Sequence, residues 1–219
     1  IGGCVRDMLL GKTPKDWDLT TNATPEQIQA VFPDSFYEND FGTVGVKTGD
    51  EDETLAIIEV TPYRKEGNYS DARRPDTVEF GVSLEEDLKR RDFTVNAIAY
   101  RSKTGEFLDQ HGGQEDLKKR LIRAVGEPKR RFEEDALRMM RAIRLSAELG
   151  FAIESETAIA IHATAANLGK TSKERIRDEL MRILATDEPM AALSIALKLG
   201  LLKYIVPDLE RGIGIDQNQ

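Results

Sequence analysis

The spacing of hydrophobic and polar residues divides the chain into two parts of different character. Up to about residue 125, short β-branched or alternating runs are separated by turn formers, which is typical of short strands mixed with short helices. After that point, apolar residues recur every three or four positions, as they do on one face of a helix. The pattern therefore predicts an α/β domain over residues 1–125 and an all-helical domain over residues 126–219.

Local signals place individual elements within the first domain. Thr24-Pro25-Glu26-Gln27 has the spacing of a capping box with proline at the first helical position, and it predicts a helix to about Val31. Ser83-Leu84-Glu85-Glu86 has the same spacing and predicts a helix toward Arg91. The stretch Arg64–Asp76 lacks periodicity and predicts a loop. Strands are expected over residues 16–20, 43–47, 55–63, 77–80, 97–100 and 121–125.

The second domain is predicted to consist of successive helices. One should span residues 132–149 and stop at Gly150, since glycine commonly follows the last turn of a helix. Others are expected over residues 155–166, 172–185 and 188–200.

Charge and composition narrow the function classes. The net charge of −8 argues against a protein that holds nucleic acid by bulk electrostatics, and residues 1–124 carry most of the excess, with 17 basic and 24 acidic residues. The single cysteine, Cys4, fits a reducing compartment, so a cytoplasmic protein is expected. The sequence contains no run of about 18 apolar residues, so it predicts no membrane span. Local basic clusters remain candidates for RNA contacts: Arg73-Arg74, Lys89-Arg90-Arg91 and Lys129-Arg130-Arg131.

Asp16-Trp17-Asp18 is the sharpest chemical signal. In a strand, residues two apart face the same side, so both carboxylates would project together. Mg²⁺ prefers carboxylate and phosphate oxygens, and two carboxylates with a triphosphate could hold two ions. Glu59 lies in the otherwise apolar Ile57-Ile58-Glu59-Val60 and is the candidate third ligand. Alone, an Asp-x-Asp is more often a solvated turn, and a lone glutamate more often an edge-strand carboxylate.

Gly2 and Gly3, followed by a short helix that carries Arg6, suit phosphate binding. Glycines allow the backbone to approach an anion, and an arginine adds a charged fork. We expect a strand upstream of Gly2 that leads into this turn. An isolated glycine pair would more often be a structural turn.

The predicted helix around residues 134–144 carries a polar stripe, in which charged residues recur every three positions: Asp135, Arg138, Arg141 and Arg144. A carboxylate that accepts from an exocyclic amino group, beside a guanidinium that donates to a ring nitrogen, would fit both cytosine and adenine. The same pair would reject uracil and guanine, whose edges are reversed. The ordinary alternative is a salt-bridged helix face.

Together these motifs resemble the class II tRNA nucleotidyltransferases, which include the bacterial CCA-adding enzymes and their poly(A) polymerase relatives. The matching segments are residues 2–7 (GGCVRD), 16–21 (DWDLTT), 59–64 (EVTPYR), 69–76 (YSDARRPD), 85–100 (EEDLKRRDFTVNAIAY), 131–145 (RFEEDALRMMRAIRL) and 148–151 (ELGF).

The resemblance implies an α+β head of polymerase-β type with a mixed sheet, followed by a helical neck. It implies CCA addition to the tRNA 3′ end with CTP and ATP, and a flexible loop at Arg64–Asp76. It assigns Mg²⁺ to Asp16 and Asp18, and base templating to Asp135 and Arg138 with Arg141 and Arg144 alongside. It assigns the triphosphate and ribose contacts to Gly2, Gly3, Arg6, Arg91, Asp92 and Asn96. Relatives continue into regions that grip tRNA, so further segments are expected beyond both ends.

Three alternatives remain open at this point. An A-adding tRNA nucleotidyltransferase or a poly(A) polymerase would share every motif. A catalytically silent RNA-binding module would not need Asp16, Asp18 and Arg6. A small-molecule nucleotidyltransferase would not need a base-reading helix.

Overall fold

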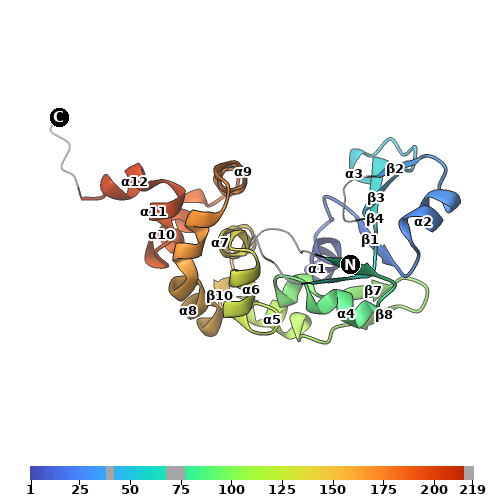
Figure 1. The fold of residues 1–219 in the computed structure, drawn as a ribbon, viewed down its shortest axis with the longest axis horizontal. Coiled ribbons are helices and arrows are strands. Elements are labelled where there is room, and N and C mark those ends of the chain that lie inside the picture. Colours follow the sequence, from blue (N-terminus) through green and yellow to red (C-terminus); the bar gives the residue numbers. More distant parts are fainter. Residues whose placement is uncertain (38–41, 68–76, 215–219) are drawn as a thin grey trace. The chain divides into compact units, whose positions relative to one another are not determined.

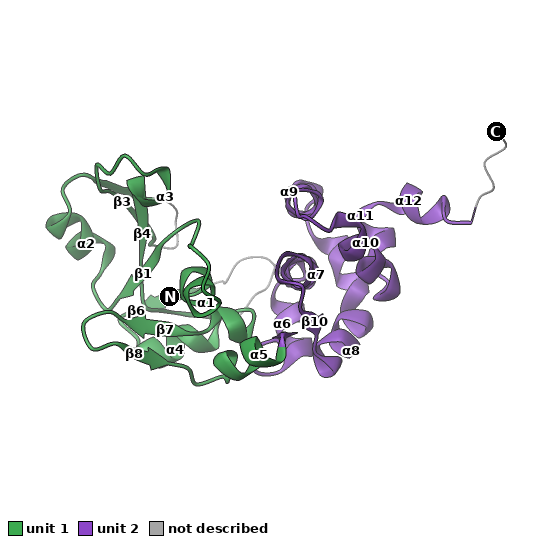
Figure 2. Ribbon diagram, turned by 180° about the vertical axis from the view of Figure 1, so that it is seen from behind, with its two compact units in different colours: residues 1–68, 75–119 green, residues 69–74, 120–219 purple. Residues whose placement is uncertain are grey.

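The computed structural model describes residues 1–37, 42–67 and 77–214 (Figure 1). These residues form two compact units, the first within residues 1–119 and the second within residues 120–219 (Figure 2). The predicted border at residue 125 lies near this division and stays a prediction. Most of the expected loop, together with Arg73-Arg74, falls outside the described residues.

A four-stranded mixed sheet forms the centre of the first unit, which confirms the predicted fold class. Its spatial order is β1-β4-β3-β2; β1 runs parallel to β4, and the other neighbours are antiparallel. Buried Val44, Val46 and Val60 form a core with Ile28 of the helix that covers the sheet. The strands are β1 (Asp18–Thr21), β2 (Ser35–Tyr37), β3 (Val44–Lys47) and β4 (Ile57–Pro62).

Shorter elements complete this unit. The strands β5 and β6 pair with each other, as do β7 and β8. The helices are α1 (Gly3–Leu9), α2 (Pro25–Val31), α3 (Glu53–Ala56), α4 (Leu84–Lys89), a 3₁₀ turn (Thr94–Asn96) and α5 (Gly113–Lys119). The remaining strands are β5 (Arg64–Glu66), β6 (Val78–Phe80), β7 (Ala99–Arg101) and β8 (Glu106–Leu108).

The two predicted capping boxes have different outcomes. At α2 the box is complete, because Thr24 accepts from the Gln27 amide and the Gln27 side chain accepts from the Thr24 amide. At α4 only half of it forms: Ser83 accepts from the Glu86 amide, while the Glu86 carboxylate bonds Lys89. Both predicted helices are therefore present, and the capping box is confirmed in full at Thr24 but only in its serine half at Ser83.

Several predicted boundaries were wrong. The strand expected at residues 16–20 begins only at Asp18, and the strand expected at 55–63 is preceded by the short helix α3. The predicted loop at Arg64–Asp76 starts as a strand, because Arg64–Glu66 pairs with β6. None of the described helices is long and apolar enough to cross a membrane.

Helices dominate the second unit, but it also contains a short parallel pair, β9 with β10, so the expectation of an all-helical domain needs correction. Side chains that are fully buried line its core, among them Phe132, Met139, Ile143 and Ile161. The elements are β9 (Leu121–Ile122), α6 (Pro128–Glu134), α7 (Leu137–Leu149), β10 (Ala152–Ile153), α8 (Ser155–Thr164), a 3₁₀ turn (Ala165–Lys170), α9 (Lys173–Leu184), α10 (Pro189–Lys198), α11 (Leu202–Ile205) and α12 (Pro207–Arg211).

The single helix predicted over residues 132–149 is interrupted at Asp135. Asp135 has extended backbone angles, φ −147° and ψ 106°, and it closes α6 before α7 begins at Leu137. Its side chain accepts from the amide of Leu137, the first residue of α7, at 3.1 Å. Aspartate often accepts from a backbone amide two residues on, which explains a break that apolar periodicity alone does not reveal.

A buried ion pair joins α7 to α9. Arg144 of α7 donates to Glu179 of α9 at 2.6 Å, and the Glu179 side chain is only 3% exposed. Glu179 also lies 3.8 Å from the largely exposed Arg182. A charge that is buried this deeply requires its partner, so the contact fixes how the two helices pack.

We predict that Glu179→Ala lowers the free energy of unfolding by about 1.5–3 kcal/mol, because it removes the buried charge-assisted hydrogen bond and leaves Arg144 paired with Glu148 alone. Arg182→Met, which removes the exposed cation of the same cluster, should cost less than about 1 kcal/mol. Urea denaturation of both variants measures this difference. Equal losses would show that burial does not decide the strength of this contact.

Candidate active site

The two aspartates of the Asp-x-Asp motif lie at the start of the edge strand of the sheet. Asp18 is the first residue of β1, while Asp16 is exposed and lies in the bend before it. The argument that both face one side of a strand therefore applies only to Asp18. Burial raises the pKa of the Asp18 carboxyl, and repulsion from the Asp16 carboxylate raises it further, so the two charges still lie close enough to interact.

Glu59, the expected third carboxylate, is in register with Asp18 across the parallel pair β1 and β4. Within the residues that the structure describes, however, no three acidic, histidine or cysteine side chains are grouped closely enough to hold a metal. The donor chemistry fits a hard cation, since carboxylate oxygens are what Mg²⁺ prefers. An ion here would need further oxygens from a substrate.

Gly2 brings the backbone close to the carboxylates and to a buried cation. Its φ is +76°, and a Cβ built on it would lie 2.9 Å from Arg91 Nη1 and 3.7 Å from Asp18 Oδ2. Any larger residue would therefore be strained and would displace Arg91. The predicted residues Gly2, Asp18 and Arg91 thus come together, although they are far apart in the sequence.

A second cluster of predicted residues forms a hydrogen-bonded chain. Arg6 donates to Asn96 Oδ1 at 2.9 Å and to Asp7 at 2.8 Å, and the Asn96 amide donates to Asp92 Oδ1 at 3.5 Å. These contacts fix the orientation of the Arg6 guanidinium, whose side chain is 13% exposed. An arginine that is aimed before a ligand arrives loses less entropy when it binds an anion.

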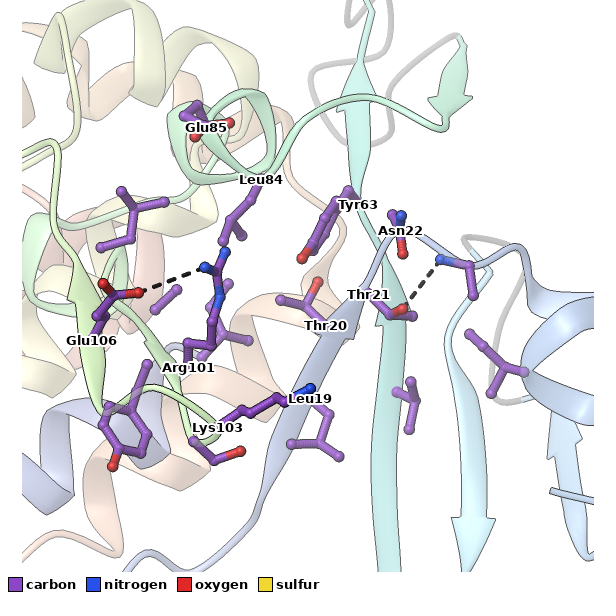
Figure 3. Close-up of a pocket in the computed structure, with 18 of the residues that line it drawn as sticks. Leu19, Thr20, Thr21, Asn22, Tyr63, Leu84, Glu85, Arg101, Lys103 and Glu106 are labelled. Carbon is purple, nitrogen blue, oxygen red and sulfur yellow. Dashed lines mark hydrogen bonds and ion pairs between the residues drawn. The ribbon is translucent and has the colours of Figure 1, made fainter. Parts of the chain in front are cut away.

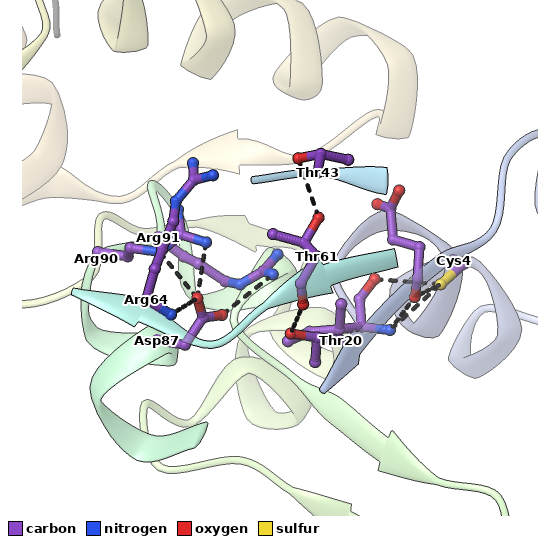
Figure 4. Close-up of polar contacts among 10 residues, drawn as sticks. Cys4, Thr20, Thr43, Thr61, Arg64, Asp87, Arg90 and Arg91 are labelled. Atoms are coloured by element: carbon purple, nitrogen blue, oxygen red, sulfur yellow. Dashed lines mark hydrogen bonds and ion pairs between the residues drawn. The ribbon is translucent and has the colours of Figure 1, made fainter. Parts of the chain in front are cut away.

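Asp87 is a functional candidate that the sequence reasoning missed. Its carboxylate has no solvent exposure, and it accepts from the Arg90 guanidinium at 2.7 and 2.9 Å (Figure 4). It also accepts from the Arg64 amide at 3.3 Å and from Arg91 Nη2 at 3.4 Å. The spacing of three and four residues on one helix could have revealed the contacts to Arg90 and Arg91. The contact to Arg64 could not be found that way.

Arg91 is a buried cation with an unsatisfied donor. Burial lowers the pKa of its guanidinium, while the Asp87 carboxylate opposes that shift. Its Nε is buried without a hydrogen-bond partner among the described residues. A buried guanidinium with unused donors is suited to bind a phosphate or a ribose oxygen.

The second unit contains the predicted base-reading residues, and each has a neighbouring partner. Asp135 Oδ2 accepts from Arg175 Nη2 at 2.8 Å, and Arg138 donates to Glu134 Oε2 at 2.8 Å. Arg138 is 9% exposed, so its guanidinium is largely withdrawn from solvent. Arg175 and Glu134 are further residues that the sequence analysis did not assign to the site.

The other two arginines of the predicted stripe lie on α7 and have different surroundings. Arg144 is bound by Glu148 at 2.8 Å as well as by the buried Glu179. Arg141 is half-buried. A direct nucleotide contact for either residue stays a prediction.

A cavity of about 1060 Å³ opens in the first unit beside β1, where Leu19, Thr20 and Thr21 line it (Figure 3). Its walls include Leu19, Tyr63, Leu84 and Arg101, and Arg101 pairs with Glu106 across 3.6 Å. None of the predicted carboxylate or phosphate-binding residues lines it. This cavity and the chemical cluster therefore have different linings, and the chemistry defines the candidate site.

A mixed sheet with two aspartates at the start of its edge strand, beside two oriented arginines, defines a nucleotidyltransferase head. A sequence model described as the poly A polymerase head domain matches residues 1–123, and one described as a probable RNA and SrmB-binding site of polymerase A matches residues 150–213. The chain belongs to this family, the class II tRNA nucleotidyltransferases, as predicted. Nucleotidyltransferases of this family are generally metal-dependent.

Curated relatives have similar sequences over nearly the whole chain. A CCA-adding enzyme of Leuconostoc mesenteroides is 45% identical over 94% of this chain and 50% of its own length. A CCA-adding enzyme of Geobacillus thermodenitrificans is 44% identical over 97% of this chain and 51% of its own. The chain thus spans about half the length of the curated relatives it matches.

Solved structures have the same fold. The CCA-adding enzyme of Bacillus stearothermophilus in complex with CTP superposes with a TM-score of 0.83 at 42% identity, over 94% of this chain and 48% of that one. A tRNA nucleotidyltransferase complexed with a primer tRNA and an incoming ATP analog has a TM-score of 0.76 at 28% identity, over 100% of this chain and 60% of that one.

We predict that Asp18→Asn stabilises the metal-free protein at neutral pH. The raised pKa of Asp18 means that the folded state binds its proton more tightly than the unfolded chain. Stability is therefore lost as the pH rises from the ordinary value of 3.8 through the folded pKa, and an amide avoids that loss. Tm at pH 7 should rise by about 1–3 °C.

Added Mg²⁺ should raise the Tm of the unaltered protein and not that of Asp18→Asn, since a ligand stabilises the state that binds it. Asp34→Asn, at an exposed carboxylate of the same unit, is the control and should respond to Mg²⁺ as the unaltered protein does. A lower Tm for metal-free Asp18→Asn would contradict the electrostatic interpretation.

Proposed function

We propose that this protein adds CMP, CMP and AMP in turn to the 3′ end of tRNA, using CTP and ATP. The observation that carries the proposal is that one chain contains both a set of groups suited to a triphosphate and a set suited to a base. The first unit brings Asp18, Arg6 and Arg91 into one region, and the second unit presents a carboxylate and a guanidinium at the junction of α6 and α7. The relatives include CCA-adding enzymes, one of them solved in complex with CTP, and a tRNA nucleotidyltransferase solved with a primer tRNA, which supports the same function.

The first unit would bind the triphosphate and the metal. Arg6, fixed by Asn96 and Asp7, would donate to phosphate oxygens, and Arg91 would offer the donors that Asp87 does not use. Asp92 and Asn96 lie in the same hydrogen-bonded chain and would contact the ribose or phosphate. Asp16 and Asp18, with Glu59 in register with Asp18, would hold two Mg²⁺ ions together with substrate oxygens. These ions would stabilise charge on the transferring phosphoryl group.

The reaction follows from these roles. The 3′-hydroxyl oxygen of the RNA forms a bond to the α-phosphorus of the nucleoside triphosphate. The bond between that phosphorus and the bridging oxygen of the β-phosphate breaks, pyrophosphate leaves, and the hydroxyl proton passes to solvent. The protein's own residues position the triphosphate, which accounts for much of the catalysis in phosphoryl transfer.

The second unit would select the base. Asp135 can only accept hydrogen bonds when ionised, and Arg138 can only donate. Cytosine and adenine both present an amino donor beside a ring-nitrogen acceptor, so one pair can serve both. Uracil presents a carbonyl and a ring N–H in their place, and each unmet buried group costs roughly 1–3 kcal/mol.

An A-adding enzyme or a poly(A) polymerase would use the same residues, so the test must separate the three. Full-length protein is incubated with tRNA that lacks CCA, with tRNA that ends in CC, and with unstructured RNA, and CTP and ATP are supplied separately. Use of CTP on the first substrate and of ATP on the second supports CCA addition. Use of ATP alone indicates an A-adding enzyme, and extension of unstructured RNA indicates a poly(A) polymerase. We further propose that the reaction takes place in the cytoplasm, which agrees with a tRNA substrate and with a single cysteine that forms no disulfide.

We predict that Asp16→Asn and Asp18→Asn each lower the rate of nucleotide incorporation by at least about 100-fold, because the charge on the transferring group loses a stabiliser. Asp34→Asn should leave the rate unchanged. Incorporation is measured with saturating Mg²⁺ and CTP, and circular dichroism checks the fold. Near-normal activity in either variant would remove that aspartate from the mechanism.

We predict that Asp135→Ala lowers the preference for CTP over UTP by about tenfold or more, because the group that repels the uracil carbonyl is gone. The relevant quantity is the ratio of kcat/KM for the two nucleotides on one tRNA. If Asp135 only bonds the Leu137 amide and pairs with a neighbour, the variant loses stability and keeps its ratio. An unchanged ratio would end the base-reading role.

A further inference from the structure

Two hydrogen bonds orient the Asp135 side chain, and Asp135 itself belongs to neither of the two flanking helices. Its backbone is extended, and it lies between α6 and α7. Oδ1 accepts from the Leu137 amide at 3.1 Å, and Oδ2 accepts from Arg175 Nη2 at 2.8 Å. The first contact limits the position of the carboxylate, and the second limits its rotation about the Cβ–Cγ bond. Leu137 is a near neighbour of Asp135 in the sequence, whereas Arg175 is 40 residues away.

Arg175 is well placed to serve as a fixed partner. It lies on α9, four residues before Glu179, so the two side chains occupy the same face of that helix. Glu179 binds Arg144 of α7 in the buried pair described above. The helix α9 therefore presents a cation to Asp135 and an anion to Arg144. The Arg175–Asp135 pair is itself partly shielded, with side chains 24% and 16% exposed.

Arg138, the other predicted base contact, has an anchor of its own. Its Nη1 donates to Glu134 Oε2 at 2.8 Å and to the Arg131 carbonyl at 3.2 Å. Glu134 also accepts from Arg131 at 2.9 Å. The acceptor and the donor are thus each oriented by a separate ion pair, one from α9 and one from α6.

We propose that Arg175 is a positioning residue for nucleotide selection, which fixes the plane of the Asp135 carboxylate so that it accepts from a base amino group and repels a base carbonyl. This inference rests on the proposed base-reading function of Asp135. Arg175 acts through Asp135 and needs no contact with the nucleotide.

The physical reason is that rejection requires an acceptor that cannot turn away. A carboxylate that rotates freely can direct its lone pairs aside when a uracil carbonyl approaches, or admit a bridging water between the two oxygens. With Oδ2 tied to a guanidinium on a packed helix, such rotation breaks a charge-assisted hydrogen bond. A mismatched base then meets an oriented lone pair, while a matched base finds that lone pair already aimed.

The test compares two arginines of the same helix in the full-length protein. Arg175→Met keeps the aliphatic length but removes every donor, and Arg175→Lys restores one charged donor. Arg177→Met is the matched control, because Arg177 lies two residues on, is 68% exposed and pairs only locally with Asp178 at 2.8 Å. For each variant, kcat/KM is measured for CTP, ATP, UTP and GTP on one tRNA substrate, together with Tm.

Arg175→Met should lower the ratio of CTP to UTP use by about tenfold, chiefly through increased UTP incorporation. Arg175→Lys should recover part of that ratio, and Arg177→Met should leave it unchanged. If Arg175→Met does not fold, as Tm and circular dichroism would show, the lysine variant decides, since it must then show a reduced ratio on a folded protein.

Three results would overturn the inference. A lower Tm with an unaltered ratio would make Arg175 structural only. An equal loss with all four nucleotides and a raised KM for tRNA would make it an RNA contact. A changed ratio in Asp135→Ala without any change in Arg175→Met would refute the positioning role and leave the proposed function intact. An unchanged ratio in both variants would instead refute base reading by Asp135.

Discussion

A carboxylate without access to solvent must be met by cations or amide donors, and this constraint arranges the functional side chains in both units. In the first unit, Asp87 has no exposed surface and gathers Arg90, Arg91 and the backbone amide of Arg64. In the second unit, the buried Glu179 of α9 forms an ion pair with Arg144 of α7. In each case the buried anion determines where arginines point, so these ion pairs are better understood as devices for orientation than as sources of stability.

This view explains why the arginines differ in their availability. Arg90 donates two hydrogen bonds to Asp87, at 2.9 and 2.7 Å. Arg91 makes one long contact with Asp87, at 3.4 Å, and its buried Nε has no partner among the described residues. Arg144 is bound by two carboxylates. The sequence alone does not distinguish these arginines by how many of their donors are already used. The structure separates the arginine with spare donors, which suits a ligand, from those that hold helices in place.

The sequence therefore predicted residue types and elements better than it predicted partners. The complete capping box at Thr24 and the mixed architecture were confirmed, because they depend on short-range spacing and on the overall alternation of patterns. The break at Asp135 was missed, since the apolar positions on both sides of it continue the same helical period. The contact from Asp87 to Arg64 and the contact from Arg175 to Asp135 join residues 23 and 40 positions apart, and no local pattern encodes such pairs.

The break at Asp135 also bears on how one site could accept two bases of different size. The backbone of a residue within a regular helix is fixed by the helical hydrogen bonds and moves with the helix. Asp135 instead lies in an extended link, with its carboxylate tied to the long side chain of Arg175. An arginine side chain can adjust its reach through several torsions while its guanidinium keeps the carboxylate plane. Under the proposed function, the Arg175 guanidinium sets the direction of the Asp135 carboxylate, and the torsions of the Arg175 side chain set how far that carboxylate reaches toward the base. The direction of the acceptor, which separates amino from carbonyl, stays fixed, while its depth can adapt to cytosine or adenine.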